Sequence, residues 1–287
     1  MTGPAVARLD GNRLHLQQGP IDLIVEAIGE DAAVEAAYAA AQSCFHGLLE
    51  ELAAELPVLR QAKGPVPAGP VARRMHAAVT ALPGDVFVTP MAAVAGAVAD
   101  HVLAAMTGAA DLAKAYVNDG GDIAFHLTPG QIMEIGLISD LERGIAGGRL
   151  KIDAASPVRG VATSGRAGRS HSLGIADAVT VLAGSAAAAD AAATLIANAV
   201  DIDHPAIARK PASALDPDSD LGDRPVTVSV GHMRMDAVAR ALDGGVSRAE
   251  SYRREGVIED AILFLRGESR IVGAMTSLAP PALNFPD

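Results

Sequence analysis

Two alanine-rich stretches, residues 92–106 and 185–200, constrain the fold of this chain most strongly. Each is long enough for about four helical turns, and each contains one aspartate, Asp100 or Asp190. Small side chains let helices approach closely. A bilayer crossing takes about 20 predominantly apolar residues, and the nearest approaches to one, residues 86–99 and 179–200, are short or carry an internal acid, Asp190. The sequence therefore predicts two buried, closely packed helices, and such a helix could equally form a homodimer interface.

Strand patterns surround these helices. Alternating residues around the turn pair Asp10-Gly11 predict an opening hairpin, followed by a third strand at residues 21–27. Helical spacing begins at Asp31 and is predicted to continue to Leu56, ending before Pro57. Beyond the second helix at 71–82, strands are predicted at residues 115–117, 123–127, 131–137, 150–152, 158–162, 178–182, 226–230 and 258–265.

The C-terminal third combines a proline- and aspartate-rich loop at residues 204–223 with two helical pieces, at 235–242 and 248–255. We find neither a clear linker nor a repeat of solenoid period. The expected fold is a single α+β domain over residues 1–287, with a mixed sheet and packed alanine-rich helices. Its motif-bearing core covers about residues 86–200.

Charge and cysteine content exclude several classes of function. The formal net charge is −11, whereas nucleic-acid and anionic-membrane binders need a basic face. Cys44 is the single cysteine, which excludes an internal disulfide and a multi-cysteine metal site. The N-terminal residues lack the pattern of a signal peptide. We therefore expect a cytoplasmic protein with a small-molecule partner and no nucleic-acid or membrane partner.

The densest group of unusual residues follows a predicted strand, at Thr163-Ser164-Gly165-Arg166-Ala167-Gly168-Arg169-Ser170-His171-Ser172. Glycines let a ligand approach the backbone, hydroxyls add donors and arginines add charge, which together suit an anion such as phosphate. His171 is a candidate for proton transfer or phosphate contact because imidazole titrates near neutrality. A simple glycine-rich turn with solvated arginines is the alternative.

A second group is Asn118-Asp119-Gly120-Gly121-Asp122, between two predicted strands. Paired glycines need no function beyond a tight turn. However, Asp122 would begin a buried strand, where a carboxylate requires a partner or a ligand to offset its desolvation.

The third candidate is the pair Asp190 and Thr194, four residues apart and therefore on one helix face. A carboxylate and a hydroxyl in that arrangement suit Mg²⁺, which takes one or two protein oxygens besides water and phosphate. A surface aspartate without function is the alternative. Asp100 has no such partner and is expected to cap or pack.

In chain order, these segments resemble motifs of the ApbE superfamily of FAD:protein FMN transferases. The matching segments are the G-G-D-I turn at 120–123, the T-S-G segment at 163–165 with Ser170-His171, and the V-T-V strand at 179–181 followed by A-D-A-x-x-T at 189–194. The phrases at residues 117–123 and 174–181 are most similar to an uncharacterised branch of that superfamily.

The resemblance implies a two-lobed α+β fold that binds FAD or FMN. It implies that Asp190 and Thr194 bind Mg²⁺ against the pyrophosphate and that His171 lies near the transferred phosphoryl group. It also implies that the nucleotide is lined by the turn residues Gly120, Gly121 and Asp122 and the loop residues Thr163, Ser164 and Gly165. The neighbouring Asn118, Arg166 and Arg169 are further candidates for binding it.

Two family segments are absent. His171 does not lead into the family's D-P-x-T-G, and residues 94–97 lack the lysine of I-A-K-G. Asp177 is the candidate replacement for the missing carboxylate. The expected function is Mg²⁺-dependent cleavage of the pyrophosphate of FAD, with transfer of FMN to a hydroxyl or to water. The alternatives are a non-catalytic flavin or nucleotide binder, and an enzyme acting on another phosphorylated or carboxylated metabolite.

Overall fold

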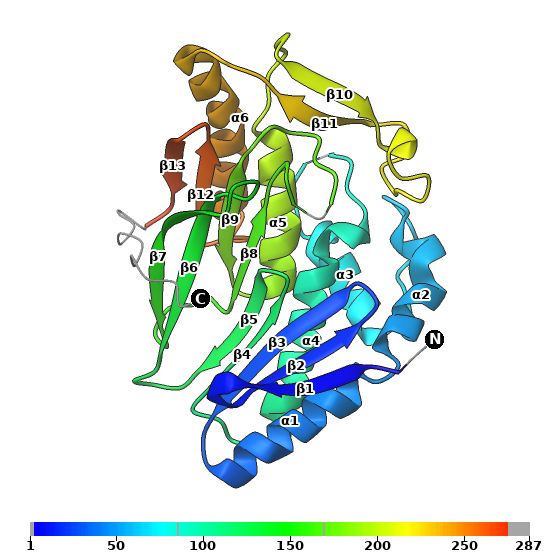
Figure 1. The fold of residues 1–287 in the computed structure, drawn as a ribbon, viewed down its shortest axis with the longest axis vertical. Helices are drawn as coiled ribbons and strands as arrows, with labels where there is room; N and C mark the ends of the chain where they lie inside the picture. The colour runs from blue at the N-terminus through cyan, green and yellow to red at the C-terminus, as the bar shows by residue number, and fades with distance from the viewer. Residues whose placement is uncertain (1–2, 85, 169, 275–287) are drawn as a thin grey trace. The chain divides into compact units, whose positions relative to one another are not determined.

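The structure, a computed structural model, describes residues 3–84, 86–168 and 170–274 (Figure 1). The chain forms two compact units, each assembled from three separate stretches of sequence. Unit 1 comprises the chain up to Met133 together with Ile152–Ala162 and Ala183–Ala191. Unit 2 comprises Glu134–Lys151, Thr163–Leu182 and the chain from Ala192 onward. Helices pack on sheets in both units, which confirms the α+β class.

Unit 1 contains an antiparallel meander in which strands that follow one another in the sequence also pair. Its strands are β1 (Ala5–Leu9), β2 (Arg13–Gln18), β3 (Ile21–Ile28), β4 (Lys114–Asp119) and β5 (Asp122–Leu127). The short helix η1 (Asp10–Asn12) turns β1 into β2. β8 (Gly160–Ser164) extends the meander through pairing of Val161 with Ile123. The predicted opening hairpin and third strand are confirmed.

The helices of unit 1 are α1 (Asp31–Phe45), α2 (Leu48–Leu59), α3 (Pro70–Thr80), η2 (Pro90–Ala93) and α4 (Val94–Ala109). α1 packs on β2 and β3, and α4 packs on β4 and β5 (Figure 1). The prediction of one helix ending before Pro57 was wrong on both counts. Gly47 takes a left-handed conformation that separates α1 from α2, and α2 continues through Pro57 to Leu59, although this proline lacks one helical N–H donor.

Among the described residues, one helical stretch, Pro90–Ala109, is long and apolar enough to cross a membrane, with a mean hydropathy of 1.4. A buried core helix meets the same criteria of length and composition. In unit 1, α4 contacts α1, α3, β4 and β5. The side chains of Val98, Val102 and Met106 are fully buried.

In unit 2, β12 (Asp260–Leu265) pairs antiparallel with both β9 (Ala178–Ala183) and β13 (Glu268–Val272), and α6 (Met235–Arg254) packs on β12 and β13. β6 (Ile132–Asp140) and β7 (Ile145–Asp153) form a separate two-stranded sheet. Every strand pair with a defined register among the described residues is antiparallel. The sheet that the sequence predicted to be mixed is therefore antiparallel.

Two predictions for the C-terminal third were wrong. Part of the predicted loop at 204–223 is a strand, β10 (Ile207–Pro211), which precedes η3 (Ala212–Ala214) and pairs with β11 (Pro225–Val230). The two predicted helical pieces are one helix, α6, which continues through Gly244 and Gly245. A side chain at Gly245 would overlap Val200 and approach Leu263, so these glycines serve close packing rather than a helix break.

The second alanine-rich helix is α5 (Ala186–Ala199). Several glycines lie so close to its backbone that a side chain in their place would not fit. In unit 1, a Cβ atom at Gly96 or Gly160 would overlap the backbone at Ala186. In unit 2, a Cβ at Gly174 would overlap the carbonyl oxygen of Ala197, and one at Gly244 would lie 2.5 Å from that of Ala199. The expectation that alanine-rich helices pack very closely is therefore confirmed.

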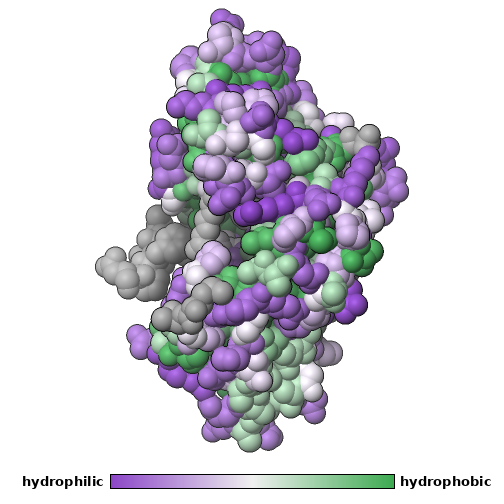
Figure 2. Space-filling view, turned by 90° about the vertical axis from the view of Figure 1, so that its right-hand side faces the viewer, coloured by the Kyte–Doolittle hydropathy of each residue, from purple (hydrophilic) through white to green (hydrophobic). Residues whose placement is uncertain are grey.

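Large hydrophobic side chains that remain exposed are distributed over many elements. On the face drawn in Figure 2, hydrophobic residues lie in patches interrupted by hydrophilic ones.

Candidate functional site

The turn between β4 and β5 is built from the paired glycines. Gly120 and Gly121 have φ angles of 63° and 117°, which two-residue hairpin turns favour and which glycine adopts without strain. The side-chain oxygen of Asn118 accepts the N–H of Gly121 at 2.8 Å and fixes the turn. Asp119 and Asp122 are directly opposite across the two strands, so their side chains leave the same face of the sheet.

Asp190 lies near these carboxylates in unit 1. Its Oδ2 accepts the N–H of Gly96 at 3.0 Å, and the N–H of Ala95 also reaches the carboxylate. Burial raises the pKa of Asp190 well above its ordinary value, the charge of Asp122 raises it further and that of Asp119 adds to this, while the two amides lower it. The carboxylates of the glycine turn and of the A-D-A-x-x-T segment, distant in sequence, therefore interact electrostatically.

A second aspartate explains why α4 and α5 lie in contact. Asp100, on α4, accepts the N–H groups of Ala186 and Ala187 at 3.0 and 2.9 Å, which caps the beginning of α5. The hydroxyl of Ser185 adds a bond from the N–H of Ala188 at 3.2 Å. The expectation that Asp100 caps or packs is confirmed.

In unit 2, the glycine loop, which we define as residues 164–168, begins over the backbone of Asp177. A Cβ at Gly165 would lie 2.7 Å from the carbonyl oxygen of Asp177, so a residue with a side chain would displace the loop. The N–H of Arg166 donates to the carbonyl of Ala176 at 2.9 Å, and the N–H of Gly168 donates to that of Gly165 at 3.1 Å.

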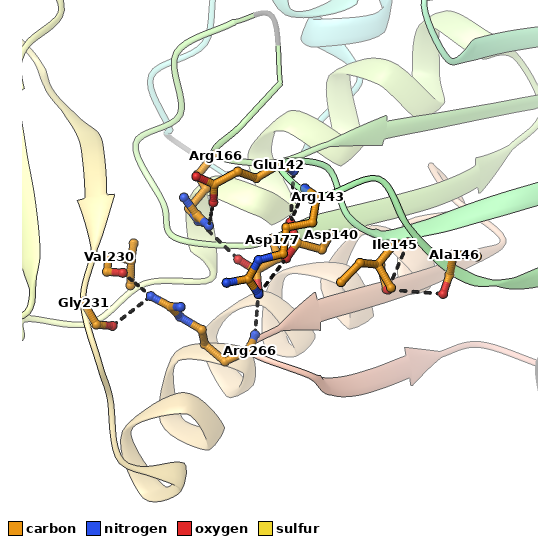
Figure 3. Close-up of polar contacts among 11 residues, drawn as sticks. Asp140, Glu142, Arg143, Ile145, Ala146, Arg166, Asp177, Val230, Gly231 and Arg266 are labelled. Atoms are coloured by element: carbon orange, nitrogen blue, oxygen red, sulfur yellow. Dashed lines mark hydrogen bonds and ion pairs between the residues drawn. The ribbon is translucent and has the colours of Figure 1, made fainter.

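Arg166 and Asp177, expected to bind the nucleotide and to act in catalysis respectively, bind each other (Figure 3). The Nε of Arg166 donates to Oδ1 of Asp177 at 3.2 Å, and its Nη2 donates to Glu142 at 2.6 Å. The other carboxylate oxygen of Asp177 accepts the backbone N–H of Arg266 at 2.6 Å. Asp177 is buried, with 5% of its surface exposed, so this carboxylate is held on both oxygens inside unit 2.

His171, three residues beyond the end of the glycine loop, is exposed, whereas its neighbour Ser172 is buried. The side-chain oxygen of Asn198, on α5, accepts the hydroxyl of Ser172 at 3.2 Å and the N–H of Leu173 at 2.9 Å. Sequence reasoning missed Asn198. The available signal was its spacing, because it follows Thr194 by four residues and continues the helix face that begins at Asp190.

The remaining candidates have simpler surroundings. The hydroxyls of Thr163 and Thr180 lie 2.8 Å apart in unit 2. Thr194 is partly exposed on α5, and Ser164 is partly exposed at the end of β8. Arg169 lies outside the described residues. No group of three or more His, Cys, Asp or Glu side chains within the described ranges could hold a metal ion by itself.

Each unit thus gathers its own part of the candidate site. Unit 1 holds Asn118, Gly120, Gly121, Asp122 and Asp190, and unit 2 holds Thr163, Ser164, Gly165, Arg166, His171 and Asp177. The interactions of the carboxylates lie within unit 1, and the contacts of the glycine loop lie within unit 2. That both groups surround one ligand remains a prediction from the sequence.

Comparison with known families decides which group of proteins this is. A family model described as AbpE bacteria matches residues 6–271. The chain belongs to that family. Membership of the AbpE bacteria family confirms the resemblance to the ApbE superfamily, and the match extends well beyond the motif-bearing core into both units.

Two curated proteins are similar to this AbpE bacteria family member over part of its length. UPF0280 protein MJ1526 of Methanocaldococcus jannaschii is 40% identical over 121 residues, which are 42% of this chain and 48% of that protein. A UPF0280 protein of Methanothrix thermoacetophila is 39% identical over 138 residues, which are 47% of this chain and 54% of that protein. The chain spans about half the length of the curated relatives it matches.

Among solved structures, the apo form of the Pseudomonas stutzeri flavinyl transferase ApbE aligns over 86% of this chain and 74% of that one. The sequence identity is 14% and the TM-score is 0.36.

Proposed function

We propose that the protein binds a flavin dinucleotide together with Mg²⁺ and transfers FMN from FAD, by pyrophosphate cleavage, to a hydroxyl or to water. Membership of the AbpE bacteria family supports a function of the ApbE type. The observation that carries the proposal is the electrostatic interaction of Asp122 with the buried carboxylate of Asp190, which accepts the first amides of α4, because both carboxylates come from motifs of that superfamily. The partner is then a small-molecule nucleotide, and the proposed location is the cytoplasm.

The donor set of unit 1 fits Mg²⁺ bound jointly with phosphate. Carboxylate oxygens are the ligands that Mg²⁺ prefers, and this ion usually takes one or two of them, completing its shell with water and substrate phosphates. The described residues contain no set of three acidic, histidine or cysteine ligands for a metal alone. Asp190 would therefore hold the ion only when a ligand supplies the remaining oxygens. Thr194, which belongs to unit 2, stays the second metal ligand expected from the sequence. When bound, Mg²⁺ would neutralise the charge that develops on the pyrophosphate.

The roles of the chain itself in this proposal are positioning and donation of hydrogen bonds. Cleavage of a phosphoanhydride depends mainly on orientation and charge neutralisation rather than on covalent chemistry by the protein. The exposed turn at Gly120 and Gly121 lets a ligand approach the backbone, since neither residue has a side chain. The exposed His171 is the candidate group for holding or donating a proton at the leaving oxygen.

One observation favours a second function, that of a non-catalytic flavin or nucleotide binder. Two donors of Arg166 are occupied by Asp177 and Glu142, so the arginine expected to stabilise transferred charge is largely held within the protein. An enzyme acting on another phosphorylated or carboxylated metabolite is the remaining alternative.

Incubation of the purified full-length chain with FAD, with and without Mg²⁺, tests the proposal through AMP release measured by chromatography. We expect release that requires Mg²⁺ and that falls by about 100-fold or more in Asp190→Asn, because a transition-state charge partner is lost. An asparagine oxygen can still accept the N–H of Gly96, so this variant keeps the contact with α4. Asp111→Asn, which changes an exposed carboxylate of unit 1, is the control.

The outcomes separate the alternatives. FAD binding measured by fluorescence, without AMP release in the presence of any hydroxyl acceptor, identifies a binder. Absence of both binding and release overturns the flavin proposal, and a thermal-shift screen of other nucleotides, pterins and organic acids then addresses the third alternative, because ligand binding raises stability by mass action.

A further inference from the structure

The polar network around Asp177 joins three segments of unit 2 that are far apart in sequence (Figure 3). Arg166 extends from the glycine loop, Glu142 from the turn between β6 and β7, and Arg266 from the turn between β12 and β13. The backbone of Asp177 adds two more links, donating to the carbonyl of Phe264 at 3.0 Å and accepting from the N–H of Leu141 at 3.5 Å.

Arg266 shows that this network holds an unfavourable conformation. Its φ angle is 53°, in the left-handed region, where a residue other than glycine is strained. The conformation directs its N–H to Asp177 at 2.6 Å, and its guanidinium donates to the carbonyl oxygens of Val230 and Gly231. Such a residue persists only when its surroundings determine its conformation. Arg266 thereby fixes the carboxylate of Asp177 relative to the end of β11.

The two acidic partners of Arg166 differ in burial. The side chain of Asp177 is 6% exposed and that of Glu142 is 57% exposed, while the guanidinium side chain of Arg166 is 13% exposed. Breaking a buried pair leaves an uncompensated charge, whereas an exposed pair contributes little. Asp177 therefore determines where Arg166, and with it the glycine loop, is held.

We infer that Asp177 is a positioning residue: acting through Arg166, it holds the glycine loop in the conformation that receives the anionic group of the nucleotide. This inference rests on the proposed function for the identity of the ligand, but its structural part does not depend on it. Both oxygens of Asp177 accept hydrogen bonds from the protein, and the residue is buried. The catalytic role expected of Asp177 as the replacement for the family's missing carboxylate is therefore replaced by a role in loop conformation.

Amide hydrogen exchange of the full-length chain without ligand tests the structural part. Asp177→Asn replaces one carboxylate oxygen by an NH₂ group, which donates hydrogen bonds. Either the N–H of Arg266 or the Nε of Arg166 then loses its acceptor. We expect exchange in peptides covering residues 163–168 to accelerate about tenfold, since hydrogen bonds to charged groups are among the strongest in proteins. Glu142→Gln removes the exposed partner of the same arginine and serves as the matched control, with a change below about threefold.

A double-mutant cycle shows whether Asp177 acts through Arg166. Arg166→Met should reproduce the exchange of Asp177→Asn, and the double variant should add nothing, because residues that act through one contact are not additive. Additive effects, or unchanged exchange in Asp177→Asn, overturn the inference. If Asp177→Asn does not fold, Arg166→Lys provides the test, since one ammonium cannot bridge both acids and loop exchange should still rise.

Binding and turnover of FAD with Mg²⁺ distinguish positioning from catalysis. A positioning role predicts that Asp177→Asn weakens FAD binding about tenfold and changes kcat at saturating FAD by less than about threefold, whereas loss of a general acid or base costs about 100-fold or more in kcat. The latter result, or a shifted pH profile of kcat, overturns the inference. If the unmodified protein does not bind FAD, the proposed function fails, and the exchange data still decide the role of Asp177.

Discussion

Asp100 and Asp190 cap each other's helices. Asp100 extends from α4 and accepts the first two N–H groups of α5, while Asp190 extends from α5 and accepts the N–H of Gly96 near the beginning of α4. Carboxylates are favourable at these positions because the first amides of a helix lack partners and carry partial positive charge. The reciprocal arrangement places Asp190, the expected metal ligand, on a contact that is already fixed by the fold.

Gly96 is the residue that makes this contact possible. A Cβ in Gly96→Ala would overlap the carbonyl oxygen of Ala186, so the helices must separate and both caps weaken. We expect the free energy of unfolding in urea to fall by about 2–3 kcal/mol. Gly108→Ala is the matched control on the same helix, because nothing lies within 4 Å of its Cβ, and it should gain about 0.5–1 kcal/mol. Equal effects of the two variants would contradict the close approach.

The cap made by Asp100 predicts a specific dependence of stability on pH. Burial raises the pKa of Asp100 above its ordinary value, although the N–H groups of Ala187 and Ala186 and the charge of Arg74 lower it. The folded state therefore holds this proton more tightly, so its contribution is largest below the ordinary pKa and is lost as the pH rises through the folded pKa. Unfolding free energies measured from about pH 4 to pH 7 should decline less steeply in Asp100→Asn than in the unmodified protein.

The two non-glycine residues with left-handed backbones among those described should respond differently to glycine. Arg266→Gly relieves the backbone cost but removes the guanidinium bonds to Val230 and Gly231, so we expect a net loss of about 1–2 kcal/mol in stability. Asn12, whose φ is 59°, has an exposed side chain that bonds Arg8, and Asn12→Gly should be within about 0.5 kcal/mol of neutral. Thermal unfolding of both variants makes the comparison. An Arg266→Gly variant more stable than the unmodified protein would show that the guanidinium bonds of Arg266 contribute nothing to stability.

Tyrosine ionisation gives a second pH-dependent test. Its absorbance change is read without a tryptophan contribution, because the chain has three tyrosines and no tryptophan. Burial and then the charge of Glu26 raise the pKa of Tyr116 to about 12. Burial is also the main cause that raises the pKa of Tyr38 and of Tyr252. Tyrosinate absorbance should therefore develop well above pH 10 in the native protein, and stability should fall as the pH rises from about 10 toward 12. Glu26→Gln should lower the pKa of Tyr116, and an unchanged titration would argue against the contact.

Local patterns were sufficient to predict most elements of this fold. Hydrophobic alternation and the turn chemistry of Asp10-Gly11 and Gly120-Gly121 depend on neighbours in sequence, and the strands they predict are present. The errors involve long-range packing. The gap between the two predicted helical pieces, at residues 243–247, contains Gly244 and Gly245, which lie inside α6 where α5 approaches it. β10 pairs with β11 across an intervening loop.

For the candidate site, the binding of one ligand by all three motifs stays a prediction. The three motifs were identified from spacing, and the structure brings Asp122 within electrostatic reach of Asp190. Spacing could not reveal that Asp177 would be occupied by Arg166 and Arg266, because Arg266 is 89 residues away in sequence and the contact depends on the turn after β12. Asn198 was missed although its helical spacing was visible, since an amide in an alanine-rich helix carries no distinctive chemistry.

The interleaving of the two units has a consequence for synthesis of the protein. Unit 1 begins at the amino end but needs β8 and the first turns of α5, so it stays unfinished until residue 191 has left the ribosome. Until then, Asp100 has no amides to cap and the apolar side of α4 lacks part of its cover. Because exposed apolar surface in a nascent chain invites aggregation, a chaperone should associate with chains stalled before that point and dissociate from longer ones.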